Sequence, residues 1–225
     1  MKLHFQNQNW RGFTFLELLI VIAMVSVVFG LFVLPVGRKN RSSATNIKCM
    51  SNLKQVALSF KMFTSDNAGS LPFVASRSLA YTNDSQAWLH FMVLSNYLGS
   101  TKILICPADI HEKHAAAFFS ADTNGAPESL ATLKNTAVSY FVGLDANESQ
   151  PDSWLVGDGQ VGDTGRIHKG PLLYANEYSS LRWPDSTHGE RPNVALADGG
   201  VSRGSNFTST ARWPANTSNR LLLPQ

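Results

Sequence analysis

The strongest constraint on this chain is an uninterrupted apolar stretch near its N-terminus, which runs from Phe13 to Leu34 and reads FTFLELLIVIAMVSVVFGLFVL. As an α-helix it would span roughly 33 Å at about 1.5 Å per residue, which matches the hydrocarbon layer of a bilayer. A secretory signal peptide has a shorter apolar core, of about 7 to 15 residues, followed by a small-x-small cleavage site. This stretch ends in LPVGR, without such a site. It is therefore predicted to be a membrane-spanning helix that the mature protein keeps.

The composition leaves room for one modest globular domain after that helix, because domains usually hold about 100 to 200 residues and the chain has 225. Only 16% of the residues are charged and the net charge is +3, so no dense basic face for nucleic acid is expected. The sequence contains no phosphate-binding loop of the G-x-x-x-x-G-K-[ST] type. We therefore do not expect an enzyme.

Glu17 is the one charged residue inside the apolar stretch. A carboxylate costs up to about 3 kcal/mol at the centre of a bilayer. Glu17 lies four residues past Phe13, close enough to the membrane surface to reach the interface or to be protonated at modest cost. A tolerated interfacial glutamate is one interpretation, and a functional carboxylate is the other.

The neighbours of Glu17 favour the functional interpretation. A basic residue, a glycine, an aromatic residue and this glutamate occur in order in RGFTFLELL, from Arg11 to Leu19. The segment resembles the cleavage and methylation signature of type IV prepilins and type II secretion pseudopilins. The resemblance implies that a prepilin peptidase cleaves between Gly12 and Phe13 and then N-methylates the Phe13 amine. Glycine suits that position because, without Cβ, it lets the backbone enter a narrow active site in an extended form.

The resemblance also implies an assembly mechanism and a fold. Glu17 would pair with the Phe13 amine of a neighbouring subunit, so that two charges neutralise each other in the membrane. The fold would be α+β and pilin-like, with a long N-terminal spine helix packed on a small antiparallel sheet. We expect a leader over residues 1–12, a transmembrane helix over 13–34, the soluble half of the spine helix over 35–68, and a periplasmic α+β domain over 69–225.

The expected location is the bacterial inner membrane, crossed once, with the leader in the cytoplasm. The basic residues that flank the helix do not by themselves give this orientation, because more of them follow the helix than precede it. The orientation therefore follows from the resemblance alone.

Beyond the apolar stretch, apolar residues continue to recur every three or four positions, which is the period of an amphipathic helix. The stripe contains Ile47, Met50, Leu53, Val56 or Ala57, Phe60 and Phe63. Polar residues are expected mostly on other sides of the helix, among them Asn46, Lys48, Asn52, Lys54 and Lys61. With Gly69 and Pro72 as stop signals, the pattern predicts one helix from about residue 13 to residue 65, bent at Pro35.

The helical signal weakens further along the chain. One more helix is predicted from Ser85 to Leu98, with Ser85 as its cap and Gly99 at its end. Apolar segments predict the strands of a small antiparallel sheet at 138–142, 153–156 and 193–197. Because Asp198-Gly199 is a tight-turn pair, residues 193–203 are predicted to form a hairpin that ends the fold.

Cys49 and Cys106 are too few for a disulfide-rich scaffold and are not spaced as a C-x-x-C zinc or redox pair. The segments CMSNLKQ, which begins at Cys49, and CPAD, which begins at Cys106, resemble parts of the soluble domain of pseudopilin-like proteins. In an oxidising compartment the two residues can form a disulfide. The alternative is a pair of free cysteines, at least one of them buried as a small apolar residue.

The segment from His188 to Gly199 resembles the C-terminal H-x9-DG signature of the same proteins, with His188 and Asp198 ten positions apart. In that family a histidine often follows the Asp-Gly pair, whereas this chain has Gly200. A metal site built on two histidines is therefore not expected here.

Two other patterns resemble metal sites only superficially. His111 and His114 are three positions apart but have no identifiable third ligand, so a solvated loop is expected. Residues 158–163, DGQVGD, lack the alternating oxygen ligands of an EF-hand, so a glycine-rich turn is preferred. No cofactor is expected; calcium, which occurs in some pseudopilin C-terminal loops, is the alternative.

Together these patterns predict a structural subunit of a type II secretion system or a related filament. Its expected partners are the inner membrane, the prepilin peptidase and other pseudopilin subunits, in homo- or hetero-oligomers, and no nucleic acid. A type IV pilin or minor pilin for adhesion or DNA uptake is one alternative, and a membrane-tethered binding module is another.

Loops 76–85 and 123–134 are expected to carry variable contacts. Trp154, Trp183 and Trp213 are expected in packing rather than at a ligand.

Overall fold

The computed structural model describes residues 12–33, 37–75, 86–109, 113–119, 127–163, 166–168, 170–175, 181–183, 188, 191–204 and 219–224. The chain divides into two compact units, Met1–Ala44 and Thr45–Gln225. Helix α1 (Phe15–Val33) lies in the first unit, whereas α2 (Gly37–Asp66) begins in the first unit and continues into the second.

Helix α1 begins with a reciprocal cap between Thr14 and Glu17. The Glu17 backbone N–H donates to Thr14 Oγ1 at 3.3 Å, and the Thr14 backbone N–H donates to Glu17 Oε2 at 3.4 Å. This capping-box arrangement satisfies two amide donors that the first turn of a helix would otherwise leave unpaired. Glu17 therefore helps to start its own helix, a local role that was not predicted from the sequence.

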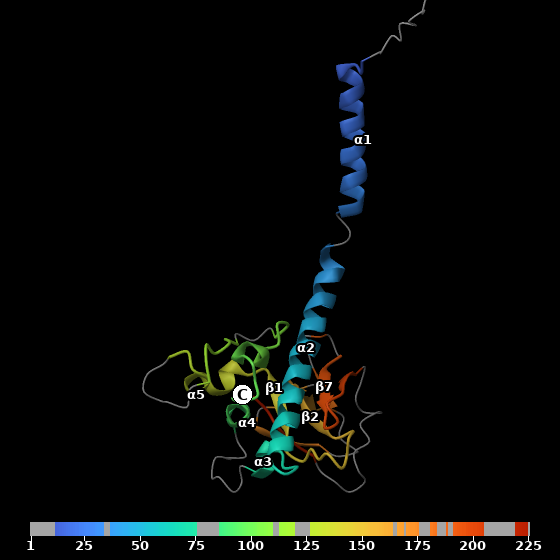
Figure 1. Cartoon of the computed structure of the whole chain (residues 1–225). Helices are drawn as coiled ribbons and strands as arrows, with labels where there is room; N and C mark the ends of the chain where they lie inside the picture. The colour runs from blue at the N-terminus through green and yellow to red at the C-terminus, as the bar shows by residue number, and fades with distance from the viewer. Residues whose placement is uncertain are drawn as a thin grey trace, which may run out of the picture. The chain divides into compact units, whose positions relative to one another are not determined.

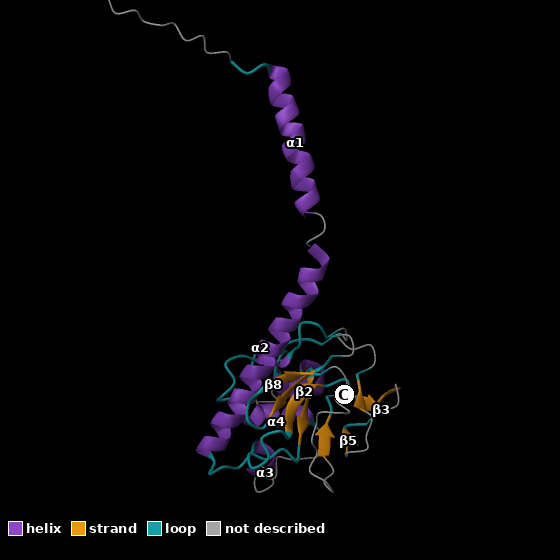
Figure 2. Ribbon diagram, turned by 90° about the vertical axis from the view of Figure 1, so that its right-hand side faces the viewer, coloured by secondary structure: helices purple, strands orange, loops and turns teal. Residues whose placement is uncertain are grey.

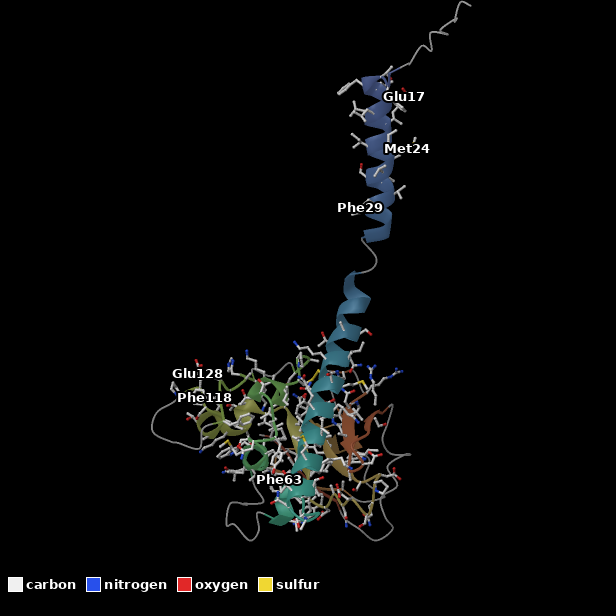
Figure 3. The ribbon with its side chains drawn as sticks, in the orientation of Figure 1. Glu17, Met24, Phe29, Phe63, Phe118 and Glu128 are labelled. Atoms are coloured by element: carbon white, nitrogen blue, oxygen red, sulfur yellow. A yellow bond between two sulfur atoms is a disulfide. The ribbon has the colours of Figure 1, made fainter. Side chains whose placement is uncertain are left out.

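The side chains of α1 have no partner in their own unit. Every residue from Phe13 to Phe29 is exposed, and Glu17, Met24 and Phe29 project outward from the helix (Figure 3). Over the residues that the structure describes, no helix combines the length and the hydropathy needed to cross a membrane. Leu34 and Pro35, where the predicted span ends and the predicted bend lies, are outside those residues.

Helix α2 ends at Asp66, one residue beyond the predicted end. The chain then turns through Gly69, whose φ is +78° and whose N–H donates to the Thr64 carbonyl at 2.9 Å. Glycine adopts this left-handed conformation without the steric cost that a Cβ brings. The predicted stop signal is therefore used as expected.

The buried face of α2 follows most of the predicted stripe. Its fully buried members are Leu53, Val56, Ala57 and Phe60. Ile47 contradicts the prediction, because it is 66% exposed, whereas Cys49, two positions later, is fully buried. Asn46 and Asn52 were expected on exposed sides but are buried. Their amides have partners there: Asn52 Nδ2 donates to the Ile105 carbonyl at 3.1 Å, and Asn46 joins a polar cluster described below.

Six antiparallel strands form the main sheet, in the order β5-β9-β1-β2-β7-β8. They are β1 (Tyr140–Gly143), β2 (Trp154–Asp158), β5 (Leu172–Ala175), β7 (Asn193–Leu196), β8 (Val201–Arg203) and β9 (Asn219–Leu222). A smaller sheet, in the order β4-β3-β6, contains β3 (Gly162–Asp163), β4 (Arg166–Ile167) and β6 (Leu181–Arg182). Helix α2 lies across one face of the six-stranded sheet (Figure 1; turned view in Figure 2). The predicted α+β class, with a helix on an antiparallel sheet, is confirmed.

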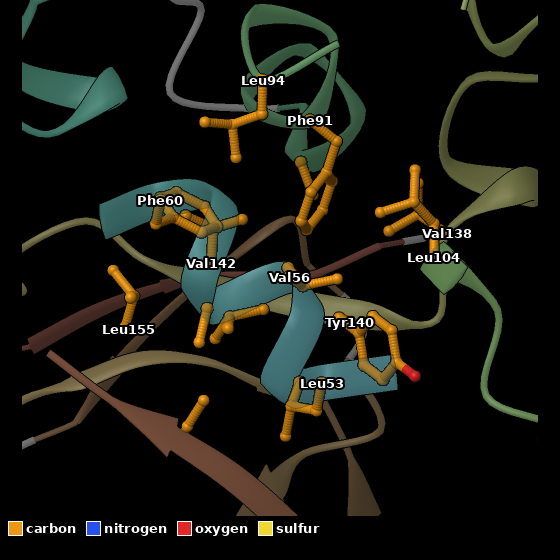
Figure 4. Close-up of a cluster of buried hydrophobic side chains, with 14 of the residues drawn as sticks. Leu53, Val56, Phe60, Phe91, Leu94, Leu104, Val138, Tyr140, Val142 and Leu155 are labelled. Carbon is orange, nitrogen blue, oxygen red and sulfur yellow. The ribbon is translucent and has the colours of Figure 1, made fainter. Parts of the chain in front are cut away.

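The larger core lies between α2 and this sheet. Val56 and Phe60 of α2 meet Val142 of β1, and Phe91 closes the cluster from α4 (Ala87–Val93) (Figure 4). The Phe60 and Phe91 rings are arranged edge to face, with their centroids 6.2 Å apart. Burial of such side chains is worth about 1.5 to 3 kcal/mol each, so this contact holds the second unit together.

A second core covers the opposite face of the sheet. Side chains alternate along a strand, so Phe141 points away from α2 while its neighbours Tyr140 and Val142 point toward it. Phe141 packs with Trp154, and Trp154 packs with Trp183 at a centroid separation of 6.0 Å. Trp154 and Trp183 therefore pack in this core, as predicted, whereas Trp213 lies outside the described residues.

Short helices complete the second unit: α3 (Pro72–Ala75), α5 (Leu130–Leu133) and two 3-10 turns, η2 (Thr101–Leu104) and η3 (Lys134–Ala137). The helix predicted from Ser85 to Leu98 is shorter than expected, because α4 is capped by Gln86 without a side-chain hydrogen bond and ends at Val93. Ser85 and loop 76–85 lie outside the described residues, as do residues 123–126 of the other predicted loop. The rest of that loop contains α5, whose Leu130 is buried.

The predicted strands and hairpin are present, but the hairpin does not end the fold. Strands β1, β2 and β7 fall on the predicted segments, and β7 pairs with β8 around Asp198-Gly199. Strand β9 follows in sequence and inserts between β5 and β1, where Leu221 and Leu222 are fully buried. This part of the prediction was wrong, because a four-residue strand at the chain end carries no turn signal or alternation that marks it.

Gly143 is the last residue of β1 and lies close to the backbone of β2. A Cβ at Gly143 would lie 2.0 Å from the Trp154 carbonyl oxygen, a backbone atom that cannot move away cheaply. We expect Gly143→Ala to lower the free energy of unfolding by about 3 kcal/mol, measured by urea unfolding of the full-length chain followed by tryptophan fluorescence.

Gly99→Ala is the matched control, because a Cβ there meets nothing within 4 Å. Its effect should stay within about 1 kcal/mol. Equal losses for the two variants would contradict the β1–β2 packing.

Candidate functional site

Cys49 of α2 and Cys106, which follows η2, lie next to each other. They form a disulfide whose Cα atoms are 5.1 Å apart and whose ends are 57 positions apart in sequence. Cys49 is fully buried, and Cys106 is 3% exposed. A covalent link across a loop of this length stabilises a fold by about 4 kcal/mol in the chain-entropy model. The disulfide therefore fastens α2 to the chain that leads into β1.

His188 lies directly against this disulfide. Its Nε2 is 3.1 Å from Cys106 Sγ and 3.6 Å from Asp158 Oδ2. The orientation of the Asn46 amide that suits both neighbours turns its oxygen to the Arg203 guanidinium and its nitrogen to His188 Nδ1, at 3.3 Å. Nδ1 then accepts a hydrogen bond, so the ring proton of a neutral His188 is on Nε2.

Asp158 ends β2 and is 4% exposed. Its Oδ2 accepts hydrogen bonds from the Asn193 backbone N–H at 2.7 Å and from Asn193 Nδ2 at 3.3 Å. Its Oδ1 has no hydrogen-bond partner among the described residues. Burial raises the pKa of this carboxyl to about 7, although the Asn193 hydrogen bonds act in the opposite direction.

His188 shifts the other way. Burial, and next the positive charge of Arg203, lower the pKa of the imidazole to about 4. Near neutral pH the ring is therefore uncharged, and its approach to Asp158 is a contact between a neutral imidazole and a partly protonated carboxyl. The cluster of Asn46, Cys49, Cys106, Asp158, His188, Asn193 and Arg203 is called the disulfide cluster below.

His188 is the first residue of the H-x9-DG signature. Its last two residues, Asp198 and Gly199, lie in the turn between β7 and β8. Gly199 has a φ of +85°, which favours glycine. Its carbonyl accepts a hydrogen bond from Lys54 Nζ at 2.5 Å, and the Asp198 carbonyl accepts one from Lys61 Nζ at 3.4 Å. Both lysines belong to α2, so the turn is tied to the helix through backbone carbonyls.

The spacing of the H-x9-DG signature now has a structural explanation. His188 lies by Cys49, near the point where α2 enters the second unit, and Gly199 lies by Lys54. Strand β7 connects the two, and the Asn193 side chain at its start lies beside the Asn46 amide. The signature therefore brackets one strand and places both of its ends against α2.

The remaining predicted site residues lie elsewhere. Gly12, Phe13 and Glu17 belong to the first unit. His114 is exposed, as expected for a solvated loop, and His111 is outside the described residues. The predicted glycine-rich turn at 158–163 is only partly right, because Asp158 closes β2 and its carboxylate faces Asn193.

Apart from His188, the polar members of the disulfide cluster were not predicted from the sequence. Asp158 was placed in a turn, Asn46 on an exposed helix side, and Asn193 in a strand without a role. Their approach depends on the pairing of β2 with β7, which no local pattern encodes. Arg203, at the end of β8, carried no signal either.

A cleft of about 420 Å³ lies at the far end of α2. Its lining includes Leu71, Phe73 and Glu148, together with the ion pair of Asp145 and Arg220, whose closest atoms are 2.7 Å apart. These groups do not form a nucleophile–base arrangement, so the cleft suggests no catalytic chemistry.

Comparisons of the chain with models of protein families, with curated proteins and with solved structures found no match. The functional interpretation therefore rests on the residues and their geometry.

Lys54 is expected to stabilise the fold through its hydrogen bond to the Gly199 carbonyl. Lys54→Met keeps the length and the apolar part of the side chain but removes the donor, and should lower the free energy of unfolding by about 1 kcal/mol. Lys48→Met is the control: Lys48 is exposed on the same helix and makes no hydrogen bond to another described residue. Urea unfolding of both variants measures the effect, and an equal response would refute the anchoring role.

Asp158 should make the fold less stable as the pH rises. Its pKa is about 7 in the folded chain against an ordinary value of 3.8, so the stability that this group contributes is fully present below about pH 4 and is lost as the pH rises through about 7. Asp158→Asn removes the dependence. The difference in unfolding free energy, wild type minus variant, should fall with pH over this window by at most about 1.4 kcal/mol per unit.

Subtracting the unfolding free energy of the Asp158→Asn variant from that of the wild type isolates the contribution of Asp158. The contribution of His188 to stability changes with pH in the opposite direction and is present in both proteins. The pKa of His188 is lowered from 6.5 to about 4, so its contribution is lost as the pH falls through that range. Urea unfolding at stepped pH gives the two curves. A difference that stays flat or rises with pH would contradict the burial of the Asp158 carboxyl.

Proposed function

We propose that this chain is a pseudopilin-like structural subunit of a type II secretion system or a related filament. In this proposal prepilin peptidase removes residues 1–12, and the subunit assembles through its N-terminal helix. The observation that carries the proposal is α1: it begins within the RGFTFLE segment, at Phe15, and the side chains from Phe13 to Phe29 are exposed.

An exposed apolar helix of this kind requires a non-aqueous partner. Apolar surface in water costs about 25 cal/mol per Å² relative to burial, and α1 exposes it on all sides. Lipid and the equivalent helices of other subunits both meet the requirement. The sequence stretch from Phe13 to Leu34 is long enough for a bilayer, so we place it in the bacterial inner membrane, with the second unit in the periplasm.

Glu17 supports assembly as well as helix initiation. Both of its hydrogen bonds to Thr14 use Oε2, so within the described residues Oε1 is available to a further donor. After cleavage the nearest free cation is the α-amine of Phe13. In the low dielectric of a membrane, pairing that amine with Glu17 of the next subunit removes two uncompensated charges at once.

The second unit is compatible with this role. A long helix on an antiparallel sheet is the arrangement expected of a pilin-like domain, and the proposal assigns the spine to α1 and α2. The disulfide and the β7–β8 turn fasten the soluble part to α2. The proposed work of the protein is assembly, and no catalytic role is included.

Two substitutions separate the charge of Glu17 from its capping role. Glu17→Gln keeps a capping-box residue but removes the charge, so the helix should still form and enter the membrane while co-assembly falls at least about tenfold. Thr14→Val is the matched control, because it removes the cap and keeps the carboxylate, and it should retain co-assembly. The measurement is co-purification of tagged and untagged copies from membranes of a host with prepilin peptidase.

Undiminished co-purification of the Glu17→Gln variant would overturn the charge-pairing mechanism. That outcome would favour a membrane-tethered binding module, which needs α1 only as an anchor.

A further inference from the structure

Three side chains that bind soft metals converge in the disulfide cluster. Cys49 Sγ, Cys106 Sγ and the ring nitrogen of His188 all lie within 4.8 Å of one another. They come from three separate parts of the chain: α2, the segment after η2, and the segment before β7. All three side chains are buried, so solvent does not compete for a bound ion.

A carboxylate completes the set of donors. Asp158 Oδ2 is 3.6 Å from His188 Nε2. Its other oxygen, Oδ1, is buried and has no hydrogen-bond partner among the described residues. A buried carboxylate oxygen left in this way is costly, and an ion placed between Asp158 and the two sulfurs would satisfy it.

We propose that Cys49, Cys106, His188 and Asp158 bind one Zn²⁺ when the two cysteines are reduced. Zinc prefers four ligands in a tetrahedron, with bonds of about 2.3 Å to sulfur and about 2.0 to 2.2 Å to nitrogen and oxygen, so its donors lie roughly 3.3 to 3.8 Å apart. The Nε2-to-Oδ2 distance of 3.6 Å already falls in that range. The sulfurs have to separate from their bonded distance, which rotation about their Cα–Cβ bonds allows.

The chemistry of binding balances without an oxidant or reductant. Cysteines are synthesised as thiols, so the site exists before any disulfide forms. Binding exchanges two S–H protons for two S–Zn bonds, and these protons go to solvent, together with the Asp158 proton wherever that carboxyl is protonated. His188 binds through the Nε2 lone pair, so its ring proton moves to Nδ1.

The charges in and around the site also balance. Two thiolates and one carboxylate give Zn²⁺ a surplus of one negative charge. Arg203, which lies beside Asn46 at the edge of the cluster, supplies one positive charge. The Asn193 hydrogen bonds hold Asp158 in place, as second-shell donors do around metal-bound carboxylates.

The metal and the disulfide would then do the same structural work in different redox states. Each joins α2 to the segment that leads into β1, and zinc adds the segment before β7 through His188. Zinc would hold α2 on the sheet while Cys49 and Cys106 are reduced, and the disulfide does so in the oxidised chain. This inference does not depend on the filament role of α1.

The test uses the full-length chain in a mild detergent, reduced anaerobically with a phosphine, which converts the disulfide and one water into two thiols and a phosphine oxide. The reduced chain is titrated with Zn²⁺, and the bound metal is counted by mass spectrometry of the elements. We expect one zinc per reduced chain and none per oxidised chain. Co²⁺ in its place should show sulfur-to-cobalt charge transfer and the visible bands of tetrahedral cobalt.

His188→Ala keeps both cysteines and should weaken zinc binding at least about tenfold. His114→Ala is the matched control, since His114 is exposed and outside the cluster, and should leave binding unchanged. The proposal is overturned if the reduced wild type binds no zinc, if oxidised and reduced chains bind it equally, or if His188→Ala binds as tightly as the control. Circular dichroism of each variant confirms that it is folded.

Discussion

One face of α2 packs on the six-stranded sheet, and the rest of the second unit is arranged around this contact. Leu53, Val56 and Phe60 are fully buried there. Most other positions of α2 in this unit are polar or exposed, so its stability comes from packing rather than from helix propensity. Burial on both faces of the sheet also explains why its central strands are nearly continuous runs of apolar residues.

Polar and covalent contacts fix the position of α2 on that surface. Apolar packing is not directional, so by itself it would allow the helix to slide or rotate on the sheet. The disulfide at Cys49 removes that freedom at one end, and Lys54 and Lys61 hold the turn of the β7–β8 hairpin further along. In the proposed filament, α2 is the covalent connection between the assembled helices and the soluble domain. These contacts would carry any load between them.

Local patterns in the sequence predicted the parts of the fold that depend on local physics. The period of α2, its end near Gly69, and the hairpin around Asp198-Gly199 all follow from backbone preference and side-chain spacing. The insertion of β9 between β5 and β1 and the pairing of Asp158 with Asn193 were missed, because both depend on strands distant in sequence. Ile47 shows the limit of periodicity, since a stripe marks a face but not where its partner surface begins.

The central claim is that α1 functions as the N-terminal helix of a processed, assembling subunit, and the mature N-terminus tests it most directly. Intact-mass and N-terminal peptide measurements on protein purified from the membranes of a host with prepilin peptidase locate that end. The account predicts a chain that begins at Phe13 and carries one methyl group on its amine. A chain that keeps residues 1–12 in that host would contradict it.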